Sequence, residues 1–299
     1  AFASGARSLK PFVRGEVRDL FRAVDVSPVI ADDEGVLRWL RDVAGYLPLV
    51  VKLFVAFAKT EQERAKKVVE AAVKDGQCAD ADAALAAELT AVANTVVGTF
   101  EANASDAPGQ LHPGLHPMVK LTLTQVRALN GEAAEAARVL LGVVAIFGSC
   151  PKALFQLGGG SGGSIFSPGA LQAGLHALEE CGSALVDERN DALVMNRVVA
   201  DALRKAGSDE GWFAGVQVAC LEFVRHVVSS GLKGSVAVGE DVAWALAGST
   251  GPLLDGVVSL NSAYPLPAVA AWAGSVVVII GALPAAPAVL VPIARLVAP

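Results

Sequence analysis

Apolar residues recur at helical spacing along almost the whole chain, and this pattern constrains the fold more than any other feature. Val36, Leu40 and Leu47, for example, share one side of a predicted helix. Alternation of apolar and polar residues, which strands would require, is scarce, and Ala, Val and Leu are abundant. We therefore predict an all-α protein without a substantial sheet.

Caps and turn residues divide this pattern into roughly ten to twelve helices of about 10–25 residues. Pro48 is expected either to kink the preceding helix or to restart it. Residues 60–63, with the sequence TEQE, match a helix-start pattern and predict a new helix there. Residues 103–117 are predicted to be irregular. A long helix is expected over 132–157, and Asp187 or Asn190 is expected to cap another that runs through Leu203.

Residues 158–164 consist only of glycine and serine. We interpret them as an engineered flexible linker, because such a composition behaves as random coil and no Gly-Lys-Ser/Thr follows to make a phosphate loop. The predicted organisation is a helical part over 1–157, the linker, and a helical part over 165–299 that packs with the first as one continuous domain. The chain begins with Ala1, and we expect it to be a fragment of a longer protein.

Helix pairs after the linker recur about every 40 residues, a period typical of an α-solenoid of stacked helical hairpins. An irregular multi-helix bundle obeys the same helical periodicity and is the alternative architecture.

Three segments carry small residues at helix-contact spacing: residues 136–142 (AARVLLG), 242–248 (VAWALAG) and 270–274 (AAWAG). They resemble part of the longest helix of armadillo and HEAT-type repeats, in which small residues let neighbouring repeats approach. The resemblance implies a scaffold that holds other proteins. Members of the nuclear-import kind bind extended peptides through a Trp followed four residues later by Asn. Here Trp244 is followed by Gly248 and Trp272 by Val276, which argues against that peptide ladder.

The charge balance and the cysteines restrict the function classes. A net charge of −6 argues against general nucleic-acid binding, which needs clustered Lys and Arg. Cys78, Cys150, Cys181 and Cys220 lie dozens of residues apart, without the spacing of a zinc site or a disulfide framework. We expect buried thiols in a reducing compartment, and we place the protein in the cytoplasm.

No constellation of catalytic residues is evident. His112 and His116 lie four apart in a segment broken by prolines, which we interpret as a solvated loop rather than a metal site. His176 and His226 lie among apolar residues and are expected at the core or its boundary. The acidic groups Asp32-Asp33-Glu34 and Glu179-Glu180 are interpreted as solvated helix ends. No catalytic, cofactor-binding or metal-binding residue is predicted.

Residues 256–294 carry no formal charge, so membrane insertion must be weighed. Prolines at 265, 267, 284 and 287 cut this run into pieces of about 16 residues or fewer, shorter than the roughly 20 that span a bilayer. We therefore favour two buried terminal helices.

These observations predict a non-enzymatic helical-repeat scaffold or adaptor that binds a protein partner, with no cofactor and no nucleic acid. A membrane-associated helical domain that uses the uncharged run 256–294 is the alternative. An enzyme or small-molecule carrier built in a helical bundle is the third hypothesis, because an apolar interior can hold a ligand with few polar groups.

Overall fold

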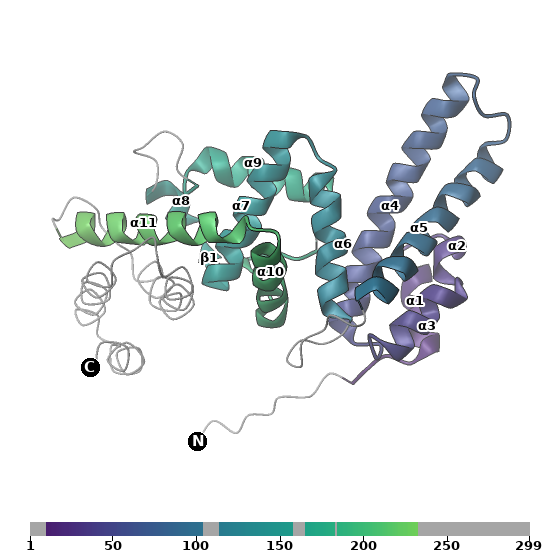
Figure 1. The fold of residues 1–299 in the computed structure, drawn as a ribbon, viewed down its shortest axis with the longest axis horizontal. Helices are drawn as coiled ribbons and strands as arrows, with labels where there is room; N and C mark the ends of the chain where they lie inside the picture. Colours follow the sequence, from purple (N-terminus) through teal and green to yellow (C-terminus); the bar gives the residue numbers. More distant parts are fainter. Residues whose placement is uncertain (1–9, 104–113, 158–164, 183, 233–299) are drawn as a thin grey trace. The chain divides into compact units, whose positions relative to one another are not determined.

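The computed structural model describes residues 10–103, 114–157, 165–182 and 184–232 (Figure 1). Helices dominate these residues, so the prediction of a mostly helical protein is confirmed. The predicted linker 158–164, the uncharged run 256–294 and the repeat-like segments 242–248 and 270–274 lie outside the described residues.

The chain forms two compact units. The first contains the residues up to Gln125 together with the short segment 180–184, and the second contains the remainder. The division falls inside the helix α6 (Leu115–Arg127) and not at the Gly/Ser stretch. That the parts on either side of this stretch pack as one continuous domain stays a prediction.

The first unit is built on two long helices, α4 (Pro48–Lys74) and α5 (Ala81–Asn103), which run side by side (Figure 1). The shorter helices α2 (Pro28–Ala31) and α3 (Glu34–Asp42) contact α5, and α1 (Arg14–Ala23) contacts α2. The rings of Phe21 and Trp39 lie 5.6 and 6.2 Å from the ring of Phe54 on α4. These buried aromatic rings join α1 and α3 to the long pair.

The predicted helix start at residues 60–63 is wrong, because α4 continues through them without a break. The Thr60 hydroxyl donates to the carbonyl of Ala56 at 3.1 Å, one turn back in the same helix, and so does not cap a new one. Gln62 is buried, and its side chain serves a tertiary contact with residues 25–27. The acidic segment 32–34 does lie at a helix end, as interpreted from the sequence, since Asp33 Oδ1 accepts the amide of Val36 at 2.9 Å at the start of α3.

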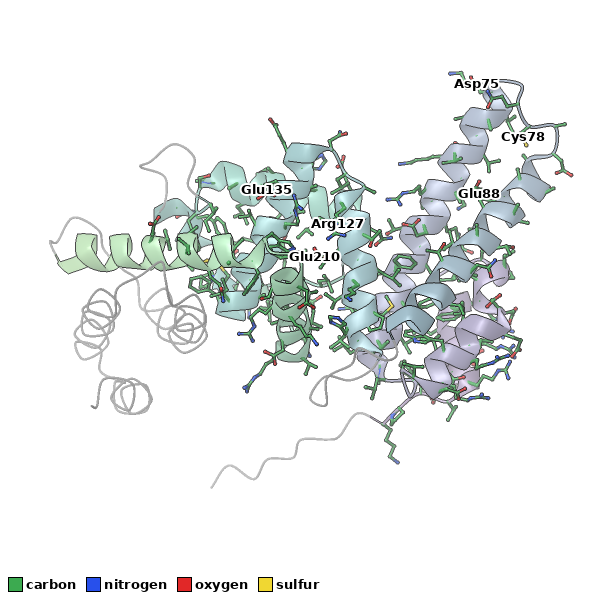
Figure 2. The ribbon with its side chains drawn as sticks, viewed as in Figure 1. Asp75, Cys78, Glu88, Arg127, Glu135 and Glu210 are labelled. Atoms are coloured by element: carbon green, nitrogen blue, oxygen red, sulfur yellow. The ribbon has the colours of Figure 1, made fainter. Side chains whose placement is uncertain are left out.

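The second unit is organised around α7 (Gly131–Phe147), in which every residue from Leu140 to Phe147 is buried. Two helices pack against it, α10 (Arg197–Asp209) and α11 (Phe213–Leu232). The carboxylate of Glu210 accepts from Trp212 Nε1 at 3.0 Å and pairs with Arg127 at 2.6 Å (Figure 2). This pair fixes the end of α6 to the turn between α10 and α11.

Between these helices the second unit contains β1 (Ser149–Pro151), α8 (Ala153–Leu157), α9 (Pro168–Glu180), β2 (Asp187–Arg189) and β3 (Ala192–Val194). The three short strands form an antiparallel sheet in the order β1-β3-β2. Cys150 of β1 and Glu188 of β2 both lie opposite Leu193 of β3.

This small sheet corrects two predictions. The helix expected over 132–157 ends at Phe147, because Gly148 takes a φ of 70° and turns the chain into β1. Asn190 and Asp191 take φ values of 48° and 58°, which is the two-residue hairpin turn that joins β2 to β3 and not the start of a helix. The next helix, α10, is capped by Asn196, whose Oδ1 accepts the amide of Val198 at 3.0 Å.

Glycines permit close packing on α7. A Cβ added to Gly174 of α9 would lie 2.8 Å from Leu140 Cβ, and one added to Gly142 would lie 2.9 Å from Val216 Cγ1 of α11. Both distances are too short for carbon atoms in contact, so a side chain at either position would push the helices apart.

We expect Gly174→Ala to lower the free energy of unfolding by about 1–3 kcal/mol through overpacking. Gly169→Ala, in the same helix but with no atom within 4 Å of the added Cβ, is the matched control and is expected to leave stability unchanged or raise it slightly. Urea unfolding followed by circular dichroism measures both, and equal effects of the two changes would contradict the packing argument.

Candidate functional site

A surface pocket of about 620 Å³ lies beside α9 in the second unit. Helix α9 supplies most of its lining, and Lys152 and Glu188 supply the rest. The residues from α9 are Gly169, Gln172, Ala173, Leu175, His176 and Glu179. The volume falls within the range of about 300–1,000 Å³ that is usual for ligand sites.

The helical period determines which side chains of α9 reach this pocket. Gly174, Ala177 and Leu178 are buried, and Gly174 lies against α7. Gln172 and His176, which are four residues apart, therefore lie on the opposite, exposed face. Pro168 begins the helix, and Ser167 Oγ accepts the amide of Ala170 at 3.1 Å.

The sheet positions the other wall of the pocket. The amide of Lys152 donates to the carbonyl of Asp191 in the hairpin turn at 2.8 Å. The ammonium group of Lys152 forms an ion pair with the carboxylate of Glu188 on β2. The hairpin thus holds Lys152 at a defined place although it lies 36 residues from Glu188 in the sequence.

The pocket carries an excess of negative charge. Lys152 and Glu188 neutralise each other, whereas Glu179 forms no hydrogen bond or ion pair with any residue that the structure describes. Glu179 is thus the lining carboxylate that no described cation neutralises, and its charge favours a cation over an anion.

The structure corrects the interpretation of the histidines. His116 is not in a solvated loop but in the first turn of α6, where it is only 2% exposed. Gly114 allows this placement, because a Cβ there would lie 2.9 Å from Ala44 Cα, and Pro117 fits a first turn that needs no amide donor. His112 and the side chain of His226 lie outside the described residues. His176 is exposed at the pocket, whereas the sequence placed it at the core or its boundary.

The four cysteines are free thiols, and three of them are buried as predicted. Cys78 is half-buried at the tip of the α4–α5 pair, where Figure 2 labels it. Burial raises the pKa of the Cys150 thiol to about 12. Burial, together with the neighbouring Cys150, also raises the pKa of Cys220 well above its ordinary value. Neither group is therefore a nucleophile at neutral pH.

These raised pKa values predict that the protein loses stability in alkaline solution. An exposed thiol in the unfolded chain loses its proton near its ordinary pKa of 9.0, whereas folded Cys150 keeps its proton up to about pH 12. Stability from this group is therefore complete below pH 9.0 and falls as pH rises from there to about 12, by up to about 1.4 kcal/mol per pH unit.

Urea unfolding across this pH range measures the loss, and Cys150→Ala is the control, since it removes one of the two titrating thiols. A variant that loses as much stability with pH as the original chain would contradict the assignment to Cys150.

The described residues offer no group of three His, Cys, Asp or Glu side chains that could hold a metal ion. Over the same residues, no helix combines the length and hydrophobicity that crossing a membrane requires. Comparisons with protein-family models, with curated proteins and with solved structures found no match for this chain.

Sequence reasoning singled out Glu179 and His176 but did not join them in one site. The helical spacing of α9 could have indicated its exposed face. Gly174, Ala177 and Leu178 lie on the buried side of the helix, and Gln172 and His176 lie on the opposite side. No pattern in the sequence places Lys152 and Glu188 beside this face.

Proposed function

We propose that this chain is a non-enzymatic helical scaffold, part of a longer protein, that holds a protein partner on the exposed face of α9. The observation that carries the proposal is the composition of that face. It presents Gln172, His176 and Glu179 beside a pocket, and the whole helix contains no Lys or Arg.

This composition favours a protein partner over nucleic acid. Helices that read DNA carry Lys and Arg toward the phosphates, and each such contact adds affinity by releasing counterions. A helix that ends in Glu179 and Glu180 and contains no Lys or Arg would repel the phosphates.

The finer architecture belongs to the same proposal, which is an α-solenoid of the armadillo or HEAT type. The antiparallel pair α4–α5 supports it, since a helical hairpin is the unit of such a stack. Gly142, at the end of the repeat-like segment 136–142, supports it as well, because it allows a close approach of Val216. The four free thiols support a cytoplasmic location.

Site-specific photo-crosslinking in the native host tests this function. A photoreactive amino acid in place of Gln172 is expected to give discrete protein adducts. The same group in place of Glu132, an exposed residue in the first turn of α7, is expected to give none. Adducts that disappear on nuclease treatment, or equal yields from the two positions, would overturn the proposal.

A further inference from the structure

We infer that the pocket beside α9 binds an arginine or lysine side chain of the partner, with the Glu179 carboxylate as the group that receives its charge. This inference rests on the proposed scaffold function, and it names the chemistry by which the partner is recognised.

The charges that line the pocket favour a cationic ligand. The Lys152–Glu188 ion pair is internally neutral, so it offers neither a spare cation to a phosphate nor a spare anion to an amine. Glu179 is the lining carboxylate without an ion-pair partner among the described residues. A single cationic group at this carboxylate completes the balance, and a guanidinium group can do so with two parallel hydrogen bonds.

The shape of the pocket fits a long side chain with an apolar stem. Gly169, which lacks a side chain, and Ala173, one helical turn later, leave open space over α9. Leu175 is half-buried and offers an apolar surface. Arginine and lysine carry a charged head on an apolar stem, and Leu175 lies one turn before Glu179 on α9, so the stem can cover Leu175 while the head reaches Glu179. The amide of Gln172 offers a further acceptor for the same head.

Lys152 limits the negative charge of the pocket. Removing its ammonium group would leave Glu188 as a second uncompensated carboxylate in the pocket. The site would then attract cations more strongly, so a lysine in the lining is expected to weaken the binding of a cationic ligand.

The test uses the full chain and short synthetic peptides, with affinity measured by fluorescence anisotropy at low salt. The probe is a peptide of alternating arginine and alanine, and its control has glutamine in place of each arginine. Glu179→Gln, which removes the charge but keeps the shape, is expected to weaken binding of the arginine peptide by about tenfold or more. Lys152→Met is expected to strengthen it about threefold or more.

Glu132→Gln is the matched control, since it removes an exposed carboxylate of the same unit outside the pocket. All the changed side chains are at least partly exposed, and circular dichroism verifies that each variant is folded. Equal binding of the two peptides, or equal effects of Glu179→Gln and Glu132→Gln, would overturn the inference. If protein adducts persist at position 172 while the arginine peptide fails to bind, the scaffold function stands and the cationic ligand is wrong.

Discussion

Replacing Phe166 with alanine is expected to lower the free energy of unfolding by about 3–5 kcal/mol. Phe166 is fully buried in the second unit, and its ring stacks on Phe223 of α11 at a centroid distance of 3.8 Å. The rings of Phe155 and Phe147 lie 5.4 and 5.8 Å away. Alanine would leave a cavity among these rings, which a close-packed core fills only partly by relaxation.

Urea unfolding of the two proteins measures this loss. Val198→Ala is the control, because its side chain is 44% exposed on α10 and its removal is expected to change stability by less than about 0.5 kcal/mol. A loss of less than about 1 kcal/mol for Phe166→Ala would show that this ring is not part of the core of the second unit.

The second large effect is expected at Gln62 of α4. Its Oε1 accepts the amide of Ser27 at 2.7 Å, and its Nε2 donates to the carbonyl of Asp25 at 3.2 Å. Gln62 thereby holds the turn between α1 and α2, in which Asp25 takes a left-handed φ of 59°. Gln62→Met keeps the length of the side chain but breaks both bonds, and it is expected to cost about 2–4 kcal/mol.

Glu70→Met is the matched control, since Glu70 is exposed on the same helix and forms no hydrogen bond with a described residue. Thermal unfolding followed by circular dichroism compares the two variants. A Gln62→Met protein as stable as the Glu70→Met protein would mean that water replaces both hydrogen bonds of Gln62 without cost.

The Gln62 example shows why one helix boundary was mispredicted. The TEQE pattern at 60–63 has the residues of a capping box, and the polar side chains suggested a break in an apolar helix. Gln62 is instead polar because it bonds to a turn 35 residues earlier in the chain. A local pattern cannot distinguish a residue that caps its own helix from one that bonds to a distant segment.

The pocket likewise combines features that a local sequence pattern shows with features that depend on contacts between distant segments. That Gln172 and His176 share one face of α9 follows from their spacing of four residues, but the sequence did not show that this face is the exposed one. The opposite wall depends on the pairing of β1 and β2 with β3, which brings Lys152 to Glu188 across 36 residues.

By itself, the sequence determined the helical class and the helix end at the acidic segment 32–34, because helical periodicity and capping residues act within a few residues of chain. Only the tertiary structure decided the sheet, the burial of His116 and the pocket. Strands of three residues are too short to show an alternating pattern, and a surface site assembled from distant segments depends on contacts that no local pattern encodes.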